Sequence, residues 1–360
     1  MTLARALLVA ILAGLVHASH VPQPDESAGA DAAIRAEMER QHVPGVAVAI
    51  VHGGVVIKAQ GYGLANVEHQ VPVTPETIFQ SGSLGKMFTA AAVMLQVEDG
   101  KLSLSDPIAK FFPAAPQAWQ AITVRHLLTH TSGIPDYTDG AIDLRKDYDE
   151  EELARMAFGL KLDFTPGEKW KYSNTGYLLL GIIIHKASGR FYGDVLADRV
   201  FTPLGMTTTR IISEADIVPH RAAGYTLVKG ELKNQEWVSP SLNTTADGAL
   251  YFSVKDLIAW DAGVRARRIL SAASWASVFD PVRLNDGKTH DYGFGWALGM
   301  RGGRKVYQHG GSWQGFKTHY AHFDRGDLSV VVLANLRQAD PGKIVDAIAT
   351  VMDPALAPGR

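Results

Sequence analysis

Strand patterns at both ends of this chain enclose a long stretch with helical patterns. Residues 45–63, GVAVAIVHGGVVIKAQGYG, hold two β-branched runs separated by His52-Gly53-Gly54, which is typical of a hairpin tip. Beyond about residue 290, short β-rich runs with Gly or Asp turns precede an amphipathic helical pattern at 341–353. Strands at both ends of a chain with helices between them predict one antiparallel sheet built from the two termini.

The middle of the chain, from about residue 102 to 265, is predicted to be mostly helical. Apolar residues recur there at helical spacing, as in NTGYLLLGIIIHKASG and SVKDLIAWDAGV. A helix with one buried face is expected from Ser83 to Asp99, and a surface helix over residues 28–41. The predicted fold is α/β of the α+β type, an antiparallel sheet flanked by helices with a large, mostly helical inserted region.

The 360 residues, 46% of them apolar, can form one large domain or two closely packed lobes. We expect this domain over residues 26–355. Its sheet lobe is predicted at about 26–100 and 266–355, and its helical lobe at about 101–265.

The first residues have the pattern of an export signal. Arg5 precedes an apolar run from Ala6 to Val16 that is too short to span a bilayer permanently, and small residues follow at Val16-His17-Ala18. We predict a signal peptide at residues 1–18 and an exported protein, periplasmic or extracellular, without stable membrane insertion after cleavage. The alternative is an uncleaved N-terminal anchor.

Charge and cysteine content exclude several classes of function. The net charge of −2 gives no basic footprint for nucleic acid or an anionic membrane. The chain has no cysteine, which excludes disulfides, thiolate metal sites and a cysteine nucleophile.

Residues 81–90, SGSLGKMFTA, hold two serines and a lysine. If a helix starts near residue 83, Ser83 and Lys86 are neighbours at i and i+3, whereas three residues after Ser81 lies Leu84. A serine hydroxyl is a weak nucleophile until a nearby base takes its proton, and an amine whose charge is disfavoured can be that base. The spacing therefore fits a nucleophile with its activator, or else a helix cap beside an exposed lysine.

Two further motifs follow in order along the chain. KYSNTGY places Tyr172-Ser173-Asn174 before an apolar helix, and VYQHGGSWQGF places His309-Gly310-Gly311 at the end of a predicted strand. With Ser83-Leu84-Gly85-Lys86, these motifs resemble those of the serine hydrolases of the penicillin-binding protein and class C β-lactamase family. HLLTHTSGIPDY (126–137) is also similar to a segment common in that family.

The resemblance implies a β-lactamase/DD-peptidase-like fold and an acyl-enzyme mechanism without metal or cofactor. Ser83 would be acylated, and Lys86 with Tyr172 would relay its proton, Lys86 being one cation that favours the phenolate. Asn174 would bond Lys86 and the substrate. The strand from His309 to Ser312 would lie along a small ester, amide or peptide substrate, and the amides of Ser83 and Ser312 would form an oxyanion hole.

The third motif departs from the class C β-lactamases. His309 stands where they carry lysine, and Gly310 replaces the usual Thr or Ser, so the anchor for a substrate carboxylate is weakened. This favours esters or peptides over β-lactams. The alternatives are a D-alanyl-D-alanine carboxypeptidase or β-lactamase proper and, from another class, a non-catalytic ligand-binding or sensor domain.

Some residues allow a second interpretation. His126 and His130 are four apart, which is metal-ligand spacing, but no Glu follows His126, so a packed helix is favoured over a metal site. Large aromatic residues could be pocket walls or core; these are Tyr137, Trp296, Trp313 and Phe316.

Overall fold

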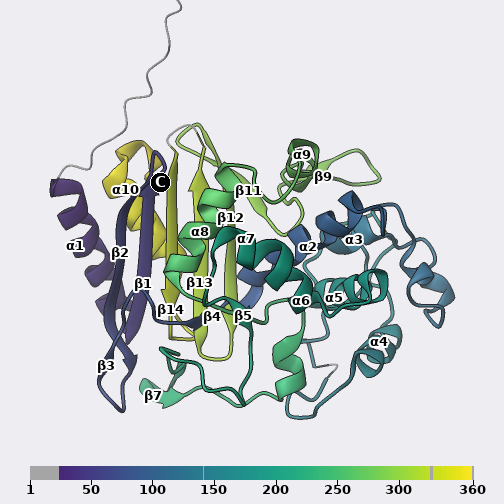
Figure 1. Ribbon diagram of the computed structural model, residues 1–360, viewed down its shortest axis with the longest axis horizontal. Helices are drawn as coiled ribbons and strands as arrows, with labels where there is room; N and C mark the ends of the chain where they lie inside the picture. Colours follow the sequence, from purple (N-terminus) through teal and green to yellow (C-terminus); the bar gives the residue numbers. More distant parts are fainter. Residues whose placement is uncertain (1–23, 141, 325–326, 359–360) are drawn as a thin grey trace, which may run out of the picture.

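The computed structural model describes residues 24–140, 142–324 and 327–358, and the predicted signal peptide at 1–18 lies outside them. Within the described residues the largest sheet has seven strands, every neighbouring pair antiparallel (Figure 1). Their order is β11 (Ala297–Arg301), β12 (Arg304–Trp313), β13 (Phe316–Phe323), β14 (Leu328–Ala334), β1 (Gly45–His52), β2 (Val55–Asn66) and β3 (Val71–Pro72).

The N-terminal hairpin and the C-terminal strands meet at the centre of this sheet. Strand β1 pairs with β2 on one side, with His52 opposite Val55, and with β14 on the other, with Val46 opposite Ala334. The turn residues Gly53 and Gly54 have positive φ values of 58° and 81°, as a two-residue hairpin with this twist requires. The prediction of one antiparallel sheet built from both termini is confirmed.

Helices cover both faces of the sheet (Figure 1). Helices α1 (Pro24–Gln41) and α10 (Pro341–Met352) lie on one face. Helix α8 (Val254–Arg265) contacts strands β1 and β14 of the same sheet. It belongs to the stretch 101–265 that the sequence analysis assigned to the helical lobe. The expected surface helix at 28–41 is α1. Its Ala30 and Ile34 are fully buried against the sheet side of the molecule.

The helical region lies to the right of the sheet in Figure 1 and contains the expected helices. They are α2 (Lys86–Glu98), α3 (Val124–Leu128), α4 (Glu150–Phe158), α5 (Asn174–Ser188), α6 (Tyr192–Leu196), α7 (Thr202–Leu204) and, beyond residue 265, α9 (Ala272–Val278). Short strands that the helical pattern did not reveal form small sheets apart from the large one. These are β4 (Phe79–Gln80) and β5 (Arg210–Ile211) with β8 (Leu250–Phe252), β6 (Tyr225–Val228) with β7 (Glu231–Asn234), and β9 (Val282–Arg283) with β10 (Thr289–His290).

The helix expected from Ser83 begins later than predicted. Residues Gly82–Gly85 form a 3-10 turn, η1, and the α-helix α2 starts at Lys86. Gly82 has a positive φ of 51°, which a turn tolerates and a helix interior does not. Because residues three apart are eclipsed in a 3-10 turn, Ser83 and Lys86 remain neighbours.

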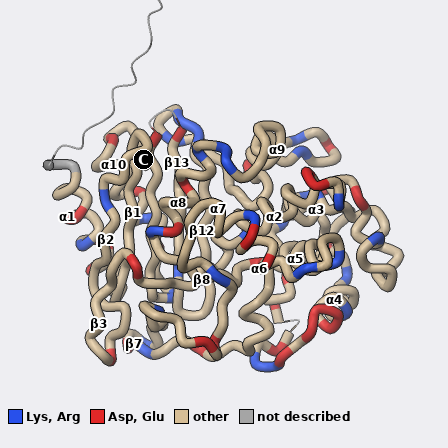
Figure 2. The backbone as a smooth tube through the Cα atoms, in the orientation of Figure 1, with Lys and Arg blue, Asp and Glu red and all other residues tan. Residues whose placement is uncertain are grey.

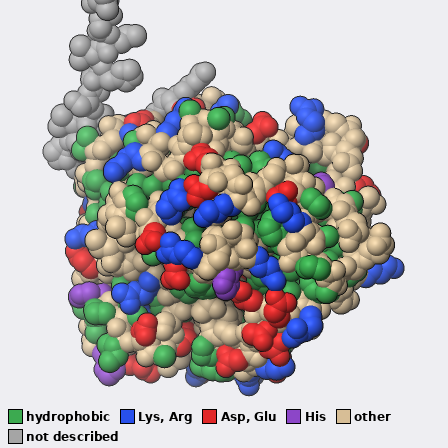
Figure 3. Space-filling model, turned by 45° about the vertical axis from the view of Figure 1, so that its right-hand side comes forward, with side chains coloured by type: hydrophobic (Ala, Val, Ile, Leu, Met, Phe, Trp, Pro, Cys, Tyr) green, Lys and Arg blue, Asp and Glu red, His purple; other side chains and the backbone are tan. Residues whose placement is uncertain are grey.

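Charged residues of both signs are interspersed along the backbone in Figure 2, and their side chains are interspersed over the face of the molecule seen in Figure 3. An acidic run, Glu150–Glu152, opens α4 and complements the positive end of that helix. None of the helices in the described part of the chain is long and apolar enough to cross a membrane.

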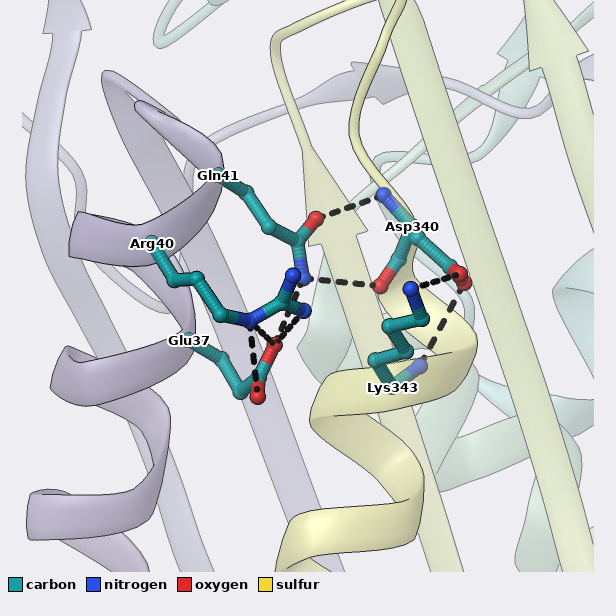
Figure 4. A network of polar contacts seen from close by, with 5 residues as sticks. All are labelled: Glu37, Arg40, Gln41, Asp340 and Lys343. Carbon is teal, nitrogen blue, oxygen red and sulfur yellow. Dashed lines mark hydrogen bonds and ion pairs between the residues drawn. The ribbon is translucent and has the colours of Figure 1, made fainter.

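Polar contacts join the end of α1 to the start of α10 (Figure 4). The Gln41 side chain accepts from the Asp340 amide at 2.7 Å and donates to the Asp340 carbonyl at 3.3 Å. The Asp340 side chain caps α10 by accepting from the Lys343 amide at 3.3 Å. These bonds fix the start of α10, which borders the groove described below.

The buried face of α10 should contribute to stability far more than its exposed face. Ile348 is fully buried in the cluster between α1, α10 and the sheet. We expect Ile348→Ala to lower the free energy of unfolding by about 2–5 kcal/mol, because lost burial adds to a cavity. Lys343→Ala, at an exposed position, should change it by less than about 0.5 kcal/mol. Urea unfolding of both variants, monitored by circular dichroism, measures the difference, and equal losses would contradict this assignment of the core.

Candidate active site

Three separate segments bring the predicted site residues together. Ser83 lies in η1 and Lys86 begins α2, Tyr172 and Asn174 stand before and at the first residue of α5, and residues 309–312 belong to β12. Ser83, Tyr172 and residues 309–312 line one groove, and Lys86 bonds both Ser83 and Asn174. The structure thus places all the predicted site residues at one location.

Glycine allows strand β12 to approach the serine turn. A Cβ on Gly311 would lie 1.9 Å from the Ser81 carbonyl oxygen, and one on Gly82 would lie 2.3 Å from the Ser312 amide nitrogen. Side chains at these positions are therefore incompatible with the observed packing. Thr318, on the next strand, donates to the same Ser81 carbonyl at 2.7 Å and holds β13 against the turn.

The amine of Lys86 lies at the centre of the polar contacts. Its side chain is fully buried, and Nζ lies 3.0 Å from Ser83 Oγ and 2.6 Å from Asn174 Oδ1. It also donates to the backbone carbonyl of Asp247. The faces of two aromatic rings lie at 5.0 Å (Tyr172) and 5.4 Å (Tyr177) from this nitrogen.

These contacts suit both protonation states of the amine. Burial lowers the pKa of Lys86 to about 8, against an opposing effect of the Asp247 and Asp136 carboxylates. The oxygens of Asn174 and Asp247 can only accept, so they use two N–H groups of the amine. In neutral Lys86 the remaining position is a lone pair, which faces the Ser83 hydroxyl.

Asp136 orients Asn174, and sequence reasoning assigned it no role. Its Oδ2 accepts from the Asn174 backbone amide at 3.0 Å and from Nδ2 at 2.8 Å. Because a carboxylate binds the NH₂ side of the amide, Oδ1 must point toward Lys86. Asp136 lies within the segment 126–137 already noted in the sequence, and that position was the only available signal.

Asp247 is a second residue that sequence reasoning missed. It is 8% exposed and accepts from Tyr137 Oη at 3.0 Å, while its Oδ1 is buried without a hydrogen-bond partner among the described residues. Burial raises its pKa, and the charge of Lys86 acts in the opposite direction. Its sequence context, TTADGAL, carries no recognisable site pattern, so contact with Lys86 arises from the tertiary fold.

The environment of Tyr172 differs from the expectation of a phenolate. Its hydroxyl is buried and forms no hydrogen bond within the described part of the chain. Burial raises the pKa of Tyr172 well above its usual value, and the neighbouring Ser83 hydroxyl opposes this only in part. Tyr172 is therefore a neutral phenol at ordinary pH, because burial disfavours its phenolate, and Lys86 Nζ lies over the face of its ring, 5.0 Å from the centroid.

His309 is neutral and buried, which resolves the charge left open by the sequence. Burial lowers its pKa to about 3, with the nearby Lys86 acting in the same direction. It therefore supplies no second cation to the site at neutral pH. Its ring nitrogens bond Tyr292 Oη at 2.9 Å and the Gly310 carbonyl at 2.6 Å.

The two histidines with metal-ligand spacing serve other purposes. His126 accepts from the Thr123 amide at 3.1 Å in the capping box of α3, and His130 accepts from the Ser173 amide at 3.2 Å. Over residues 24–140, 142–324 and 327–358, no group of three or more His, Asp or Glu side chains could hold a metal ion.

Two pockets meet at Ser83. One, of about 40 Å³, is lined by Asn174, Asp247, Tyr137 and Trp313 among others. The other, of about 610 Å³, is an open groove that includes Tyr172, residues 309–312, Lys317 and the start of α10. Of the four aromatic residues left undecided, Tyr137 and Trp313 line the small pocket, Trp296 belongs to the core, and Phe316 is buried beside a separate polar pocket.

A family model described as Beta-lactamase matches residues 30–351. Penicillin-binding protein 4* of Bacillus subtilis (strain 168) is 33% identical over 305 residues, which cover 80% of this chain and 67% of that protein. The D-aminopeptidase of Gluconobacter oxydans (strain 621H) is 30% identical over 317 residues, which cover 86% of this chain and 59% of that protein.

Solved structures resemble this one over most of its length. The octameric penicillin-binding protein homologue from Pyrococcus abyssi has a TM-score of 0.81 and 32% identity, covering 92% of this chain and 78% of that chain. The D-amino acid amidase from Ochrobactrum anthropi SV3, complexed with L-phenylalanine amide, has a TM-score of 0.80 and 25% identity, and the match covers 92% of this chain and 99% of the amidase chain.

The lowered pKa of Lys86 predicts a specific pH dependence. If the free amine takes the serine proton, the rate at which a fluorophosphonate labels Ser83 should rise with pH and level off, with a midpoint near the Lys86 pKa of about 8. Intact-protein mass spectrometry between pH 6 and pH 10 gives this rate. Lys86→Met should label slowly and without that midpoint. A wild-type midpoint near 10, the usual range for lysine, would show that burial does not set the reactivity.

Proposed function

Because this chain belongs to the β-lactamase family and is a hydrolytic enzyme, we propose that it is an exported serine hydrolase that forms an acyl-enzyme with ester or amide substrates, peptides included. The family membership confirms the resemblance carried by the three sequence motifs. The amide- and peptide-cleaving activities in the names of the D-amino acid amidase and D-aminopeptidase support an amide carbonyl as a target.

In the first half of the proposed reaction, Ser83 Oγ attacks the carbonyl carbon while its proton passes to the lone pair of Lys86. The oxygen that becomes negative is held by the amides of Ser83 and Ser312. As the bond to the leaving group breaks, neutral Tyr172 donates its phenol proton to the departing oxygen or nitrogen and is reprotonated from Lys86. The result is an acyl-serine and a neutral leaving group.

In the second half, water replaces the leaving group. It attacks the acyl carbon, its proton passes to Lys86, and the same two amides hold the negative oxygen. When the bond from the acyl carbon to Ser83 Oγ breaks, the proton returns to that oxygen and a carboxylic acid is released. Asn174, fixed by Asp136, keeps the amine oriented through both halves.

Export is part of the proposal. Its support is the apolar run from Ala6 to Val16 after Arg5, a pattern of secretory signals. A small ester, amide or peptide outside the cytoplasm is accordingly the expected substrate, with neither nucleic acid nor a bilayer as partner.

The observation that carries the proposal is the distance of 3.0 Å between the fully buried amine of Lys86 and the hydroxyl of Ser83, whereas the Ser81 hydroxyl does not bond that amine. A fluorophosphonate should add once to the wild-type protein and not to Ser83→Ala. Ser81→Ala is the matched control and should still add the probe once, although more slowly, because the Ser81 hydroxyl bonds the Gly248 carbonyl at 3.0 Å and helps to hold the turn. Intact-protein mass spectrometry reads both. Equal labelling of Ser83→Ala, or none of the wild type, would instead favour a ligand-binding domain without turnover.

A second candidate, a carboxypeptidase that requires a free carboxylate on the leaving group, is favoured by Lys317. Tyr172, the proposed proton donor to the leaving group, lines the groove that also contains Lys317 and does not line the small pocket. Lys317 is partly buried and forms no ion pair in the described ranges. Asp340 is already engaged, since it caps α10 and lies 3.8 Å from Lys343 Nζ (Figure 4).

This candidate predicts a charge-dependent preference. A peptide ending in a free carboxylate should be cleaved with a higher kcat/KM than the same peptide ending in an amide. Lys317→Gln should reduce that preference by about tenfold or more, because a charge-assisted bond is lost, while Lys305→Gln, an exposed change on β12, should not. Steady-state kinetics on the two peptides provide the test. No preference in the wild type would leave the broader esterase and amidase activity as the function.

A further inference from the structure

A chain of hydrogen bonds runs through the aromatic cluster behind Tyr172. The Ser173 amide lies 3.2 Å from His130 Nδ1, His130 Nε2 lies 3.2 Å from Tyr292 Oη, and Tyr292 Oη lies 2.9 Å from His309 Nε2. At the far end, His309 Nδ1 lies 2.6 Å from the Gly310 carbonyl oxygen. The chain therefore connects the loop before α5 to strand β12.

The two ends of this chain determine where every proton lies. An amide can only donate, so His130 Nδ1 accepts and its proton is on Nε2. A carbonyl can only accept, so His309 carries its proton on Nδ1 and presents a lone pair at Nε2. Tyr292 then accepts from His130 and donates to His309. Each ring is neutral, and the direction of all the bonds is fixed.

His130 also contacts Tyr172 directly. The two ring centroids are 4.3 Å apart, and the ring centroid of Tyr177 lies 5.1 Å from that of His130. His130 is 1% exposed and Tyr292 4%, and neither lines the groove or the small pocket at Ser83. Both residues are thus placed to act on the reacting groups only through others.

We propose that His130 and Tyr292 are positioning residues. His130 packs against the Tyr172 ring and holds it in place. Tyr292 donates to the Nε2 lone pair of His309 and so keeps the His309 proton on Nδ1. With that lone pair engaged, His309 does not accept the phenol proton of Tyr172, which stays available for the leaving group. The inference rests on the proposed function, because it assigns these residues to the proton transfer through Tyr172.

Removal of the Tyr292 hydroxyl tests this directly. Tyr292→Phe keeps the ring but frees His309 Nε2, so kcat for a small peptide, whose amine leaving group needs the Tyr172 proton, should fall roughly tenfold, the effect of one lost hydrogen bond, with KM unchanged. Tyr192→Phe is the matched control, because its buried hydroxyl bonds the Thr245 carbonyl at 3.1 Å outside the chain, and it should keep the wild-type kcat.

A double variant separates positioning from a general loss of stability. His130→Phe retains an aromatic ring beside Tyr172 but removes the bond that orients the Tyr292 hydroxyl toward His309, so Tyr292→Phe with His130→Phe should lose little more kcat than Tyr292→Phe alone. Losses that multiply, or equal losses in Tyr192→Phe, would overturn the proposal.

Tautomers provide a readout that does not depend on activity. Two-bond proton–nitrogen correlation spectra of the ¹⁵N-histidine-labelled wild type at pH 7 should show His309 protonated on Nδ1 and His130 on Nε2, each assigned by its loss in a substituted variant. The opposite tautomer at His309, or a charged ring, would refute the chain even if the enzyme is active. A wild type that no fluorophosphonate labels would refute the proposed function and leave these tautomers standing.

Discussion

The site depends on one amine kept out of water. Desolvation disfavours the charged form of Lys86 and lowers its pKa, while the carboxylates of Asp136 and Asp247 favour the charged form and raise the pKa. The opposing effects leave a pKa of about 8, so the amine can accept and return a proton near neutral pH. Two carbonyl acceptors then decide its geometry, because they take two N–H groups and leave the third position toward Ser83.

This placement requires parts of the chain that are far apart in sequence. The serine turn is fixed by Ser81, whose side chain bonds Gly248 and whose carbonyl bonds Thr318, more than 160 and 230 residues away. Strand β12 can lie against the turn only because Gly311 has no side chain to meet that carbonyl. The sheet built from both termini therefore does more than form a core. It brings strand β12, from the C-terminal part of the chain, against the turn that carries Ser83.

Sequence reasoning identified what local spacing encodes and missed what only folding brings together. The Ser83–Lys86 contact follows from a separation of three residues, and the hairpin tip at Gly53 from residue type. Asp247 and Tyr292 meet the site through tertiary contacts between distant segments, so no short pattern marks them. The protonation of Tyr172 also depends on burial, which a one-dimensional pattern does not contain.

The neutral state of His309 changes what the third motif contributes. A lysine there would place a second cation near Lys86, lower the Lys86 pKa further and attract a substrate anion. A histidine with both nitrogens bonded inside the protein does neither, so strand β12 offers the substrate its backbone and little charge. Lys317, on the neighbouring strand, lines the same groove as Tyr172. In the proposed reaction, selectivity for charge would depend on Lys317 and proton transfer on Lys86 and Tyr172, so the two properties would rest on different residues.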